Sequence, residues 1–266
     1  QLEIGNRLRQ AVTNGELELH YQPQVLVETG EFIGVEALLR WKHAAIGFVS
    51  PGTFIPVAEE LGLIASFGEW AIEQTLRQCA AWQREGLETL RVAVNISPAH
   101  FAQEDFAARF RSLFERAEPG SVILELELTE SVLVENLDRA RELMQNLARS
   151  GIGFAIDDFG TGHSSLAYLQ KLPIQRLKIA QTFIREISSA DERPALAANM
   201  IRLASDLGVS CIAEGVETPE QANALKAMKC SEAQGYLYSK PLTGTELTHW
   251  LRSGAASAKK IAEPAG

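Results

Sequence analysis

The chain is poor in cysteine, has no long apolar run and carries no excess of basic residues. Its three cysteines are odd in number and form no C-x-x-C pair, so we expect no disulfide framework and a reducing, cytoplasmic location. No apolar run approaches the roughly 20 residues of a membrane helix, so we expect no membrane contact by this domain, although the full-length protein can be tethered to one. The net charge of −9 argues against a polymeric nucleic acid as partner, because such partners favour a basic face.

Short β-rich stretches alternate with longer amphipathic helical stretches along the chain. The pattern predicts strands at 17–27, 32–41, 90–97, 122–129, 153–158, 176–180, 209–215 and 235–239. It predicts helices within 75–86, 106–117, 137–151 and 218–229. Eight strands with interleaved helices in 266 residues favour an α/β fold of the (β/α)8 TIM-like type, which takes about 250 residues.

The two ends of this barrel have features of their own. Only the turn 28–31 separates the first two strands, so the first strand is expected to run antiparallel to the second. The opening residues read as a helix already under way, and we expect a domain excised from a longer multidomain protein. The barrel domain is expected to span 1–252, and the small and polar segment 253–266 to form a flexible tail.

Polar residues recur at the ends of the predicted strands, which a barrel gathers around one mouth. They are Glu36 near the end of the second strand, Asn95, Glu127, Asp157 and Asp158, Lys178 within the sixth strand, Glu214, and Gln234 at the start of the eighth. Five converging carboxylates repel one another, and Lys178 and Arg40 cannot balance them all. Divalent cations can, and ligands of this kind favour Mg²⁺ or Mn²⁺ over zinc. The adjacent Asp157 and Asp158 favour a pair of ions bridged by one carboxylate.

Eight sequence motifs point to one family. They are YQP at 21–23, EALLRW at 36–41, NISP at 95–98, ELTES at 127–131, DDFGTG at 157–162, LKI at 177–179, AEGVET at 213–218 and QGYLYSKP at 234–241. In this order, over roughly residues 1–252, they resemble the EAL family of cyclic-di-GMP-specific phosphodiesterases. The resemblance implies hydrolysis of cyclic-di-GMP to linear pGpG by in-line attack of a water that two metal ions activate.

The resemblance also implies roles for individual residues. Catalysis would rest on Lys178, Glu36 and Glu214, with Lys178 contacting the attacking water and the scissile phosphate. The first metal ion would be held by Glu36, Asn95, Glu127 and Asp157, and the second by Asp157, Asp158 and Glu214. Substrate contacts would come from Gln22, Leu38, Arg40, Asn95, Asp157, Lys178, Glu214, Glu217, Gln234 and Pro241. Glu130 would hold a loop that contains Phe159, Gly160, Thr161 and Gly162.

Further expectations concern ions, partners and biological role. Two Mg²⁺ or Mn²⁺ ions would serve the reaction, whereas Ca²⁺ would bind but inhibit, because its looser coordination places the water less well. The resemblance implies a homodimer formed near the loop 158–165 and an upstream sensor or GGDEF domain. It implies a role in bacterial signalling and biofilm formation.

One departure from the family pattern leaves alternatives open. The usual LKID motif reads LKIA here, so Ala180 replaces an aspartate near Lys178. We expect an active enzyme with a reduced rate, since every direct metal ligand is kept. A catalytically weak cyclic-di-GMP receptor, or a metal phosphoesterase acting on another nucleotide, are the alternatives. Glu125 shares the inward face of Glu127, and its expected Lys or Arg partner cannot be named from the sequence.

Overall fold

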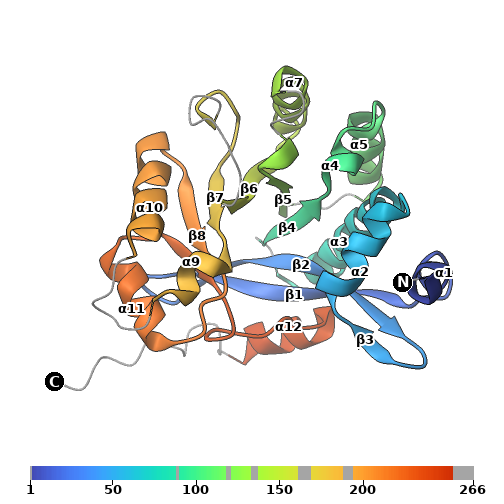
Figure 1. Cartoon of the computed structure of the whole chain (residues 1–266), viewed down its shortest axis with the longest axis horizontal. Coiled ribbons are helices and arrows are strands. Elements are labelled where there is room, and N and C mark those ends of the chain that lie inside the picture. Colours follow the sequence, from blue (N-terminus) through green and yellow to red (C-terminus); the bar gives the residue numbers. More distant parts are fainter. Residues whose placement is uncertain are drawn as a thin grey trace.

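Eight strands close into a barrel with helices around it, as predicted (Figure 1). The computed structural model describes residues 2–87, 90–117, 121–132, 137–160, 169–187 and 194–253. The barrel strands are β1 (Leu17–Leu26), β2 (Phe32–His43), β4 (Arg91–Ile96), β5 (Ile123–Thr129), β6 (Gly153–Phe159), β7 (Arg176–Ile179), β8 (Ser210–Ala213) and β9 (Glu232–Gln234). A short strand β3 (Gly47–Val49) pairs with the end of β2 outside the ring.

The first strand closes the barrel and runs against both of its neighbours. β1 pairs antiparallel with β2, where Gln22 lies opposite Glu36, and antiparallel with β9, where Gln24 lies opposite Gln234. The other neighbouring pairs of the ring, from β2 to β4 and on to β9, are parallel. The predicted barrel and its antiparallel first strand are therefore confirmed.

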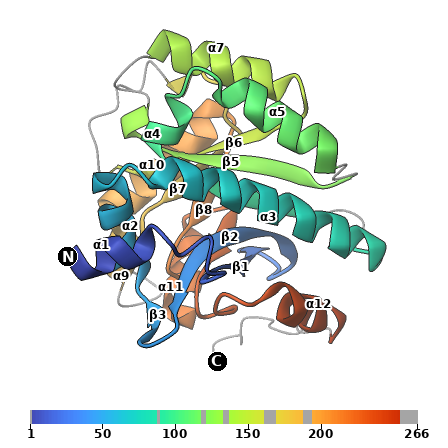
Figure 2. The same cartoon turned by 90° about the vertical axis from the view of Figure 1, so that its right-hand side faces the viewer.

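Helices cover the outside of the barrel, and α3 lies beside α5 along one side of it (Figure 2). Those described are α1 (Leu2–Leu8), α2 (Pro51–Glu60), α3 (Ile64–Arg84), α4 (Pro98–Phe101), α5 (Phe106–Ala117), α7 (Leu137–Ala148), α9 (Gln181–Arg185), α10 (Ala195–Leu207), α11 (Pro219–Ala227) and α12 (Gly244–Arg252). The stretch predicted at 75–86 is the second half of the longer helix α3. The described part of the chain contains no helix long and apolar enough to cross a membrane.

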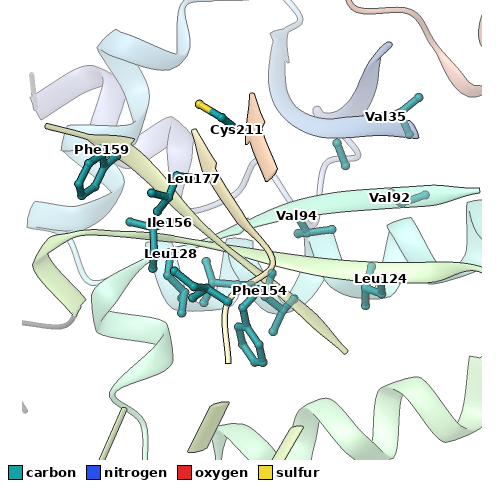
Figure 3. Close-up of a cluster of buried hydrophobic side chains, with 14 of the residues drawn as sticks. Val35, Val92, Val94, Leu124, Leu128, Phe154, Ile156, Phe159, Leu177 and Cys211 are labelled. Carbon is teal, nitrogen blue, oxygen red and sulfur yellow. The ribbon is translucent and has the colours of Figure 1, made fainter. Parts of the chain in front are cut away.

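Strand alternation separates the apolar core from the barrel interior. In β5 the side chains of Leu124, Leu126 and Leu128 pack outward against the helices, each at most 1% exposed, whereas Glu125 and Glu127 point inward. Figure 3 shows Val35, Val92, Leu124 and Phe154 in this outer cluster, which joins successive strands. Each such side chain contributes about 1.5–3 kcal/mol when fully buried, so this layer is the main source of stability.

A second, smaller core joins α1 to the rest of the domain. Leu8 of α1 packs with Trp41 of β2 and with Phe54 of α2, all fully buried. Phe67 of α3 belongs to the same cluster. The opening residues therefore form a helix, as expected, and this helix is anchored on α2.

The eighth strand lies earlier than its predicted position. The aromatic-rich stretch 235–239 has a high β-propensity, yet the strand is Glu232–Gln234 and the chain turns directly after it. Gly235 lies so close to the loop after β8 that a Cβ atom there would be 2.0 Å from the carbonyl oxygen of Val216. Leu237 N donates back to that same carbonyl at 3.0 Å. Gln234 thus ends the strand instead of opening it.

The second strand extends further than predicted. Its parallel pairing with β4 ends at Ala37 opposite Val94, and β2 then continues to His43 in a hairpin with β3. Glu36 therefore lies in the middle of β2, but close to the point where the strand leaves the barrel. The expected tail from residue 254 onward lies outside the described residues.

Candidate active site

The predicted polar residues meet at the carboxyl ends of the barrel strands. We call them the mouth cluster: Glu36, Asn95, Glu127, Asp157, Asp158, Lys178, Glu214, and the glutamines Gln22 and Gln234. Most are buried; the side chains of Asp157 and Glu214 are 14% and 20% exposed, and Asn95 and Asp158 face solvent. Distances among these side chains agree with the prediction that the strand ends converge.

Lys178 lies at the centre of the cluster, with its side chain 1% exposed. Its Nζ is 2.7 Å from Glu127 Oε2 and 2.7 Å from Glu214 Oε1. Asp157 Oδ1 and Glu36 Oε2 follow at 3.2 and 3.4 Å. Burial disfavours the ammonium charge, but the four carboxylates outweigh it and raise the pKa of Lys178 well above its usual value. Lys178 is therefore a fixed positive charge.

Glu36 is held by two amide groups. Asn95 Nδ2 donates to Glu36 Oε1 at 2.6 Å, and Gln234 Nε2 donates to Glu36 Oε2 at 2.6 Å. Burial raises the pKa of Glu36, but Lys178 and the two amide donors more than offset this effect and hold the pKa below its usual value. Glu36 is thus an ionised and oriented carboxylate.

Other carboxylates of the mouth cluster resist ionisation. Burial and the negative charge of Glu36 raise the pKa of Glu127 well above its usual value, although Lys178 opposes the shift. Burial and the neighbouring Asp157 raise the pKa of Glu214 to about 8. Glu127 Oε1 is buried and has no hydrogen-bond partner in the described part of the chain. A single ammonium therefore does not satisfy the negative charge gathered here.

A local irregularity brings two consecutive aspartates to one side. Neighbouring residues of a strand normally point to opposite faces. The register of β6 against β7 shifts between Ile156 and Phe159, and Asp158 adopts a φ of 51°, which non-glycine residues seldom do. Carboxylate oxygens of Asp157, Asp158 and Glu214 consequently lie within 4.8 Å of one another, as expected of residues that share a cation.

A second tier of buried charges lies deeper in the barrel. We call it the basal cluster: Gln24, Arg91, Glu125, Arg176 and Glu232. Arg176 Nη1 donates to Glu125, and Arg176 Nε donates to Glu232 Oε2 at 2.8 Å. Arg91 Nη2 lies 2.9 Å from Glu232 Oε2. The partner of Glu125 that the sequence left unnamed is thus Arg176.

The charge balance differs between the two tiers. In the basal cluster two arginines face two glutamates, so its charges cancel. In the mouth cluster five carboxylates face one ammonium, which leaves four negative charges if all five are ionised. The charges of the basal tier cancel one another, although Arg91 Nε and Glu125 Oε1 have no hydrogen-bond partner among the described residues, whereas the mouth has an excess of carboxylates that further cations would offset.

A cavity of about 330 Å³ opens beside the mouth cluster. Its wall includes five predicted site residues: Leu38, Arg40, Asn95, Asp157 and Asp158. Apolar side chains from α2 and α3, Ile55, Ile64 and Phe67 among them, complete the wall. The combination of an apolar wall and acidic end suits a ligand with ring systems and a phosphate that cations bridge to the acids.

The remaining predicted site residues take different positions. Gln22 is buried and bonded to Gln234, whereas Glu217 is exposed and accepts from Gln181 Nε2 at 3.2 Å. Pro241 is half-buried in the segment before α12. The predicted loop residues begin with Glu130 and Phe159, both buried, and Gly160, which has a φ of 94°. Thr161 and Gly162 lie outside the described residues.

Sequence reasoning missed most of the basal cluster. Gln24 lies two residues from Gln22 and so shares its face, a signal that could have placed it in the barrel. Arg91 and Arg176 open their strands, where a surface position is the ordinary expectation. Only the closed barrel brings them together with Glu232.

Comparisons with known proteins agree on one family. The family model described as "EAL domain" matches residues 5–241. The chain is 40% identical over 249 residues to the bifunctional diguanylate cyclase/cyclic di-GMP phosphodiesterase MucR of Pseudomonas aeruginosa, covering 93% of this chain and 36% of that protein. It is 36% identical to the oxygen sensor protein DosP of Escherichia coli, covering 95% and 32%. The chain spans about a third of the length of these relatives.

The fold of this chain is also similar to solved structures. One of them, described as "PaMucR Phosphodiesterase, c-di-GMP complex", superposes with a TM-score of 0.86 at 39% identity, covering 92% of this chain and 99% of the other. A second, the EAL domain of Mycobacterium smegmatis DcpA, has a TM-score of 0.72 at 32% identity, covering 90% and 97%. The chain belongs to the EAL domain family.

Proposed function

We propose that this chain hydrolyses cyclic-di-GMP to linear pGpG. The observation that carries the proposal is the gathering of five carboxylates around a single ammonium, directly beside the 330 Å³ cavity. The similarity to MucR, which is named a cyclic di-GMP phosphodiesterase and has been solved with that ligand, supports the choice of substrate.

Divalent cations fit the mouth cluster on two independent observations. Glu127 Oε1 is a buried oxygen without a hydrogen-bond partner among the described residues, and three further carboxylates converge within 4.8 Å. We propose two ions, held by Glu36, Asn95, Glu127, Asp157, Asp158 and Glu214. Mg²⁺ or Mn²⁺ suits these oxygen and amide ligands. Bound there, such cations lower the pKa of a water to about 7 and offset the charge of the phosphate.

The side chains of the chain itself complete the chemistry. Lys178 supplies a permanent positive charge and a hydrogen-bond donor beside the carboxylates, where the scissile phosphate must lie. The groove residues Leu38 and Arg40 orient the substrate in the cavity. Water attacks the phosphorus in line and expels the sugar 3′-oxygen, so that no covalent enzyme intermediate forms.

A chromatographic assay tests this function. Purified protein is incubated with cyclic-di-GMP and Mg²⁺ or Mn²⁺, and conversion to pGpG is followed over time. Glu36→Gln removes one charge from the mouth cluster with little change of shape, and Glu142→Gln removes one from the exposed face of α7. We expect turnover in the wild type and in Glu142→Gln and its loss in Glu36→Gln. No turnover with any divalent cation, in a protein that is folded, would refute the enzyme.

A second candidate is a cyclic-di-GMP receptor with weak catalysis. It is favoured by Ala180, which caps α9 directly after Lys178 and Ile179 and is 3% exposed. The missing carboxylate at this position removes polar support next to the site. Tight binding of cyclic-di-GMP without conversion, measured by calorimetry, would identify a receptor. A generic metal phosphoesterase would instead cleave other cyclic dinucleotides equally well.

The setting of the domain is part of the proposal. We expect a cytoplasmic domain, a homodimer, and control by an upstream sensor or GGDEF domain, in bacterial signalling that affects biofilm formation. Support for control by another domain comes from the relatives, which are about three times as long as this chain and include one named a diguanylate cyclase and one named an oxygen sensor protein.

A further inference from the structure

A hydrogen-bonded path leads from the basal cluster to Glu36. Arg91 Nη2 lies 2.7 Å from Gln24 Oε1, and Gln24 Nε2 lies 2.9 Å from Gln234 Oε1. Gln234 Nε2 then lies 2.6 Å from Glu36 Oε2. Gln24 is fully buried and Gln234 is 4% exposed, so water does not compete for these bonds.

The two ends of the path fix the direction of every bond in it. A guanidinium group only donates, so the Gln24 oxygen must face Arg91 and the Gln24 amide nitrogen must face Gln234. The Gln234 oxygen consequently accepts, and its amide nitrogen is left to donate to Glu36. The orientation of the Gln234 amide group is thus determined by the charge of Arg91, two side chains away.

A second anchor enforces the same orientation. Gln22 Nε2 donates to the main-chain carbonyl of Ser239 at 3.2 Å, and a carbonyl oxygen only accepts. The Gln22 oxygen therefore faces Gln234 and accepts from its Nε2 at 3.0 Å. Both neighbours of Gln234 require its amide nitrogen to point toward Glu36.

The barrel leaves room for the arginine that starts this path. Gly34 lies opposite Gln24 in the pairing of β1 with β2. A Cβ atom at Gly34 would lie 2.8 Å from the Arg91 carbonyl oxygen and 3.1 Å from Arg91 Nε. A side chain at Gly34 would push Arg91 away, so the glycine is needed for the arginine to lie inside the barrel.

We infer that Arg91 and Gln24 are positioning residues for the active site. Through Gln234 they hold the Glu36 carboxylate with one oxygen bonded to an amide N–H, in the orientation that cation binding uses. They touch neither the proposed substrate nor a proposed metal ligand. The expected effect of Arg91 and Gln24 on turnover rests on the proposed function. Their expected effects on the Gln234 amide and on cation binding do not.

The decisive pair of variants is Gln24→Glu and Gln24→Met. A carboxylate at position 24 still accepts from Arg91 but cannot donate to Gln234, so it favours turning the Gln234 nitrogen away from Glu36, against the orientation that Gln22 holds. Methionine fills similar space without forcing the turn, because Gln22 still orients Gln234. We expect Mn²⁺ affinity, measured by calorimetry, to fall about 10- to 100-fold in Gln24→Glu and several-fold less in Gln24→Met.

A matched pair at Arg91 tests the other end of the path. Lysine also only donates, so Arg91→Lys keeps the polarity, whereas Arg91→Met removes it. We expect Arg91→Lys to stay within a few-fold of the wild type in Mn²⁺ affinity and Arg91→Met to lose more. For turnover, kcat should fall in the damaging variants while KM for cyclic-di-GMP changes less, because Leu38 and Arg40 in the cavity wall are unchanged. Thermal melting confirms that each variant is folded.

The side-chain amide signal of Gln234 in ¹⁵N-labelled, metal-free protein reports the orientation directly. We expect a proton shifted downfield by the Glu36 carboxylate in the wild type, and loss of that shift in Gln24→Glu. Folded Gln24→Glu protein with wild-type Mn²⁺ affinity and an unchanged amide signal would overturn the inference. A wild type that binds Mn²⁺ but does not hydrolyse cyclic-di-GMP would refute the proposed function alone. If the wild type binds no Mn²⁺, the amide signal alone decides on the positioning role.

Discussion

Lys178 Nζ lies 2.7 Å from one oxygen of Glu127, whereas the other oxygen of Glu127 has no hydrogen-bond partner in the described part of the chain. One half of this buried carboxylate is thus satisfied by the protein and the other half is left open. The roles of Lys178 and Glu127 can therefore be distinguished by experiment, because Lys178 supplies positive charge to the proposed reaction and Glu127 supplies a proposed metal ligand.

Replacing Lys178 with methionine should strongly reduce turnover while leaving cation binding intact. The variant loses a donor and a positive charge at the phosphate, so we expect kcat to fall by a factor on the order of 10²–10³. Mn²⁺ affinity should stay equal or increase, because the carboxylates lose their internal competitor. Calorimetry and the pGpG assay measure the two quantities. The exposed Lys171→Met serves as the control, and a parallel loss of affinity and turnover would contradict the assignment.

Replacing Glu127 with glutamine should have the opposite signature. The raised pKa of Glu127 shows that its charge is costly in the metal-free protein, so the neutral variant should melt at the same or a higher temperature. The increase in melting temperature on adding Mg²⁺ or Mn²⁺ should be largely lost. Thermal shift with and without cation measures both effects. A metal-free variant that melts well below the wild type would show that the carboxylate is structural.

Removing divalent cations should abolish activity reversibly. A chelator is expected to stop conversion of cyclic-di-GMP, and an excess of Mg²⁺ or Mn²⁺ should restore it. Ca²⁺ should raise the melting temperature, yet restore little activity and inhibit the Mg²⁺-activated reaction, because its coordination is larger and less regular. Full turnover with Ca²⁺ as the only cation would contradict the choice of metal.

Restoring an aspartate at position 180 should increase both stability and rate. Ala180 occupies the N-cap of α9 and makes no side-chain cap bond, so a capping residue should add about 1 kcal/mol. Ala180→Asn supplies the cap without the charge and separates the two effects. We expect both variants to melt higher but only Ala180→Asp to raise kcat, by about 10-fold. Equal turnover in the wild type and Ala180→Asp would show that the missing carboxylate costs nothing.

Acid should weaken the basal cluster through Glu232. Burial raises the pKa of Glu232, but Arg176 and Arg91 outweigh it, so the pKa lies below its usual 4.5. Such a carboxylate contributes stability that is complete above the unfolded-state pKa and disappears as the pH falls through the folded-state value. Glu232→Gln should therefore cost about 3 kcal/mol at pH 7 and progressively less below pH 4.5. Urea unfolding at several pH values, with Glu142→Gln as control, measures the difference. A cost independent of pH would assign the loss to packing.

The sequence predicts those parts of the molecule that local pattern determines. The alternation of β5 places Glu125 and Glu127 inside the barrel and three leucines outside, which the structure confirms. The partner of Glu125 was not named because Arg176 lies 51 residues away, although Arg176 shares the inward face of Lys178, two residues along the same strand. The predicted eighth strand, observed as β9, was misplaced because the close approach of Gly235 to Val216 is a tertiary contact. The bulge at Asp158 likewise depends on the register of two strands.

The reversed direction of β1 determines where a neighbouring module can contact the domain. In an all-parallel barrel the chain enters at the face opposite the mouth, but here α1 packs through Leu8 on α2 and shares a core with Ile64 and Phe67, which line the cavity. One layer of side chains therefore separates the first helix from the space for the ligand. A module joined ahead of α1 could change the width of the cavity by displacing α1 alone, without any rearrangement of the barrel strands.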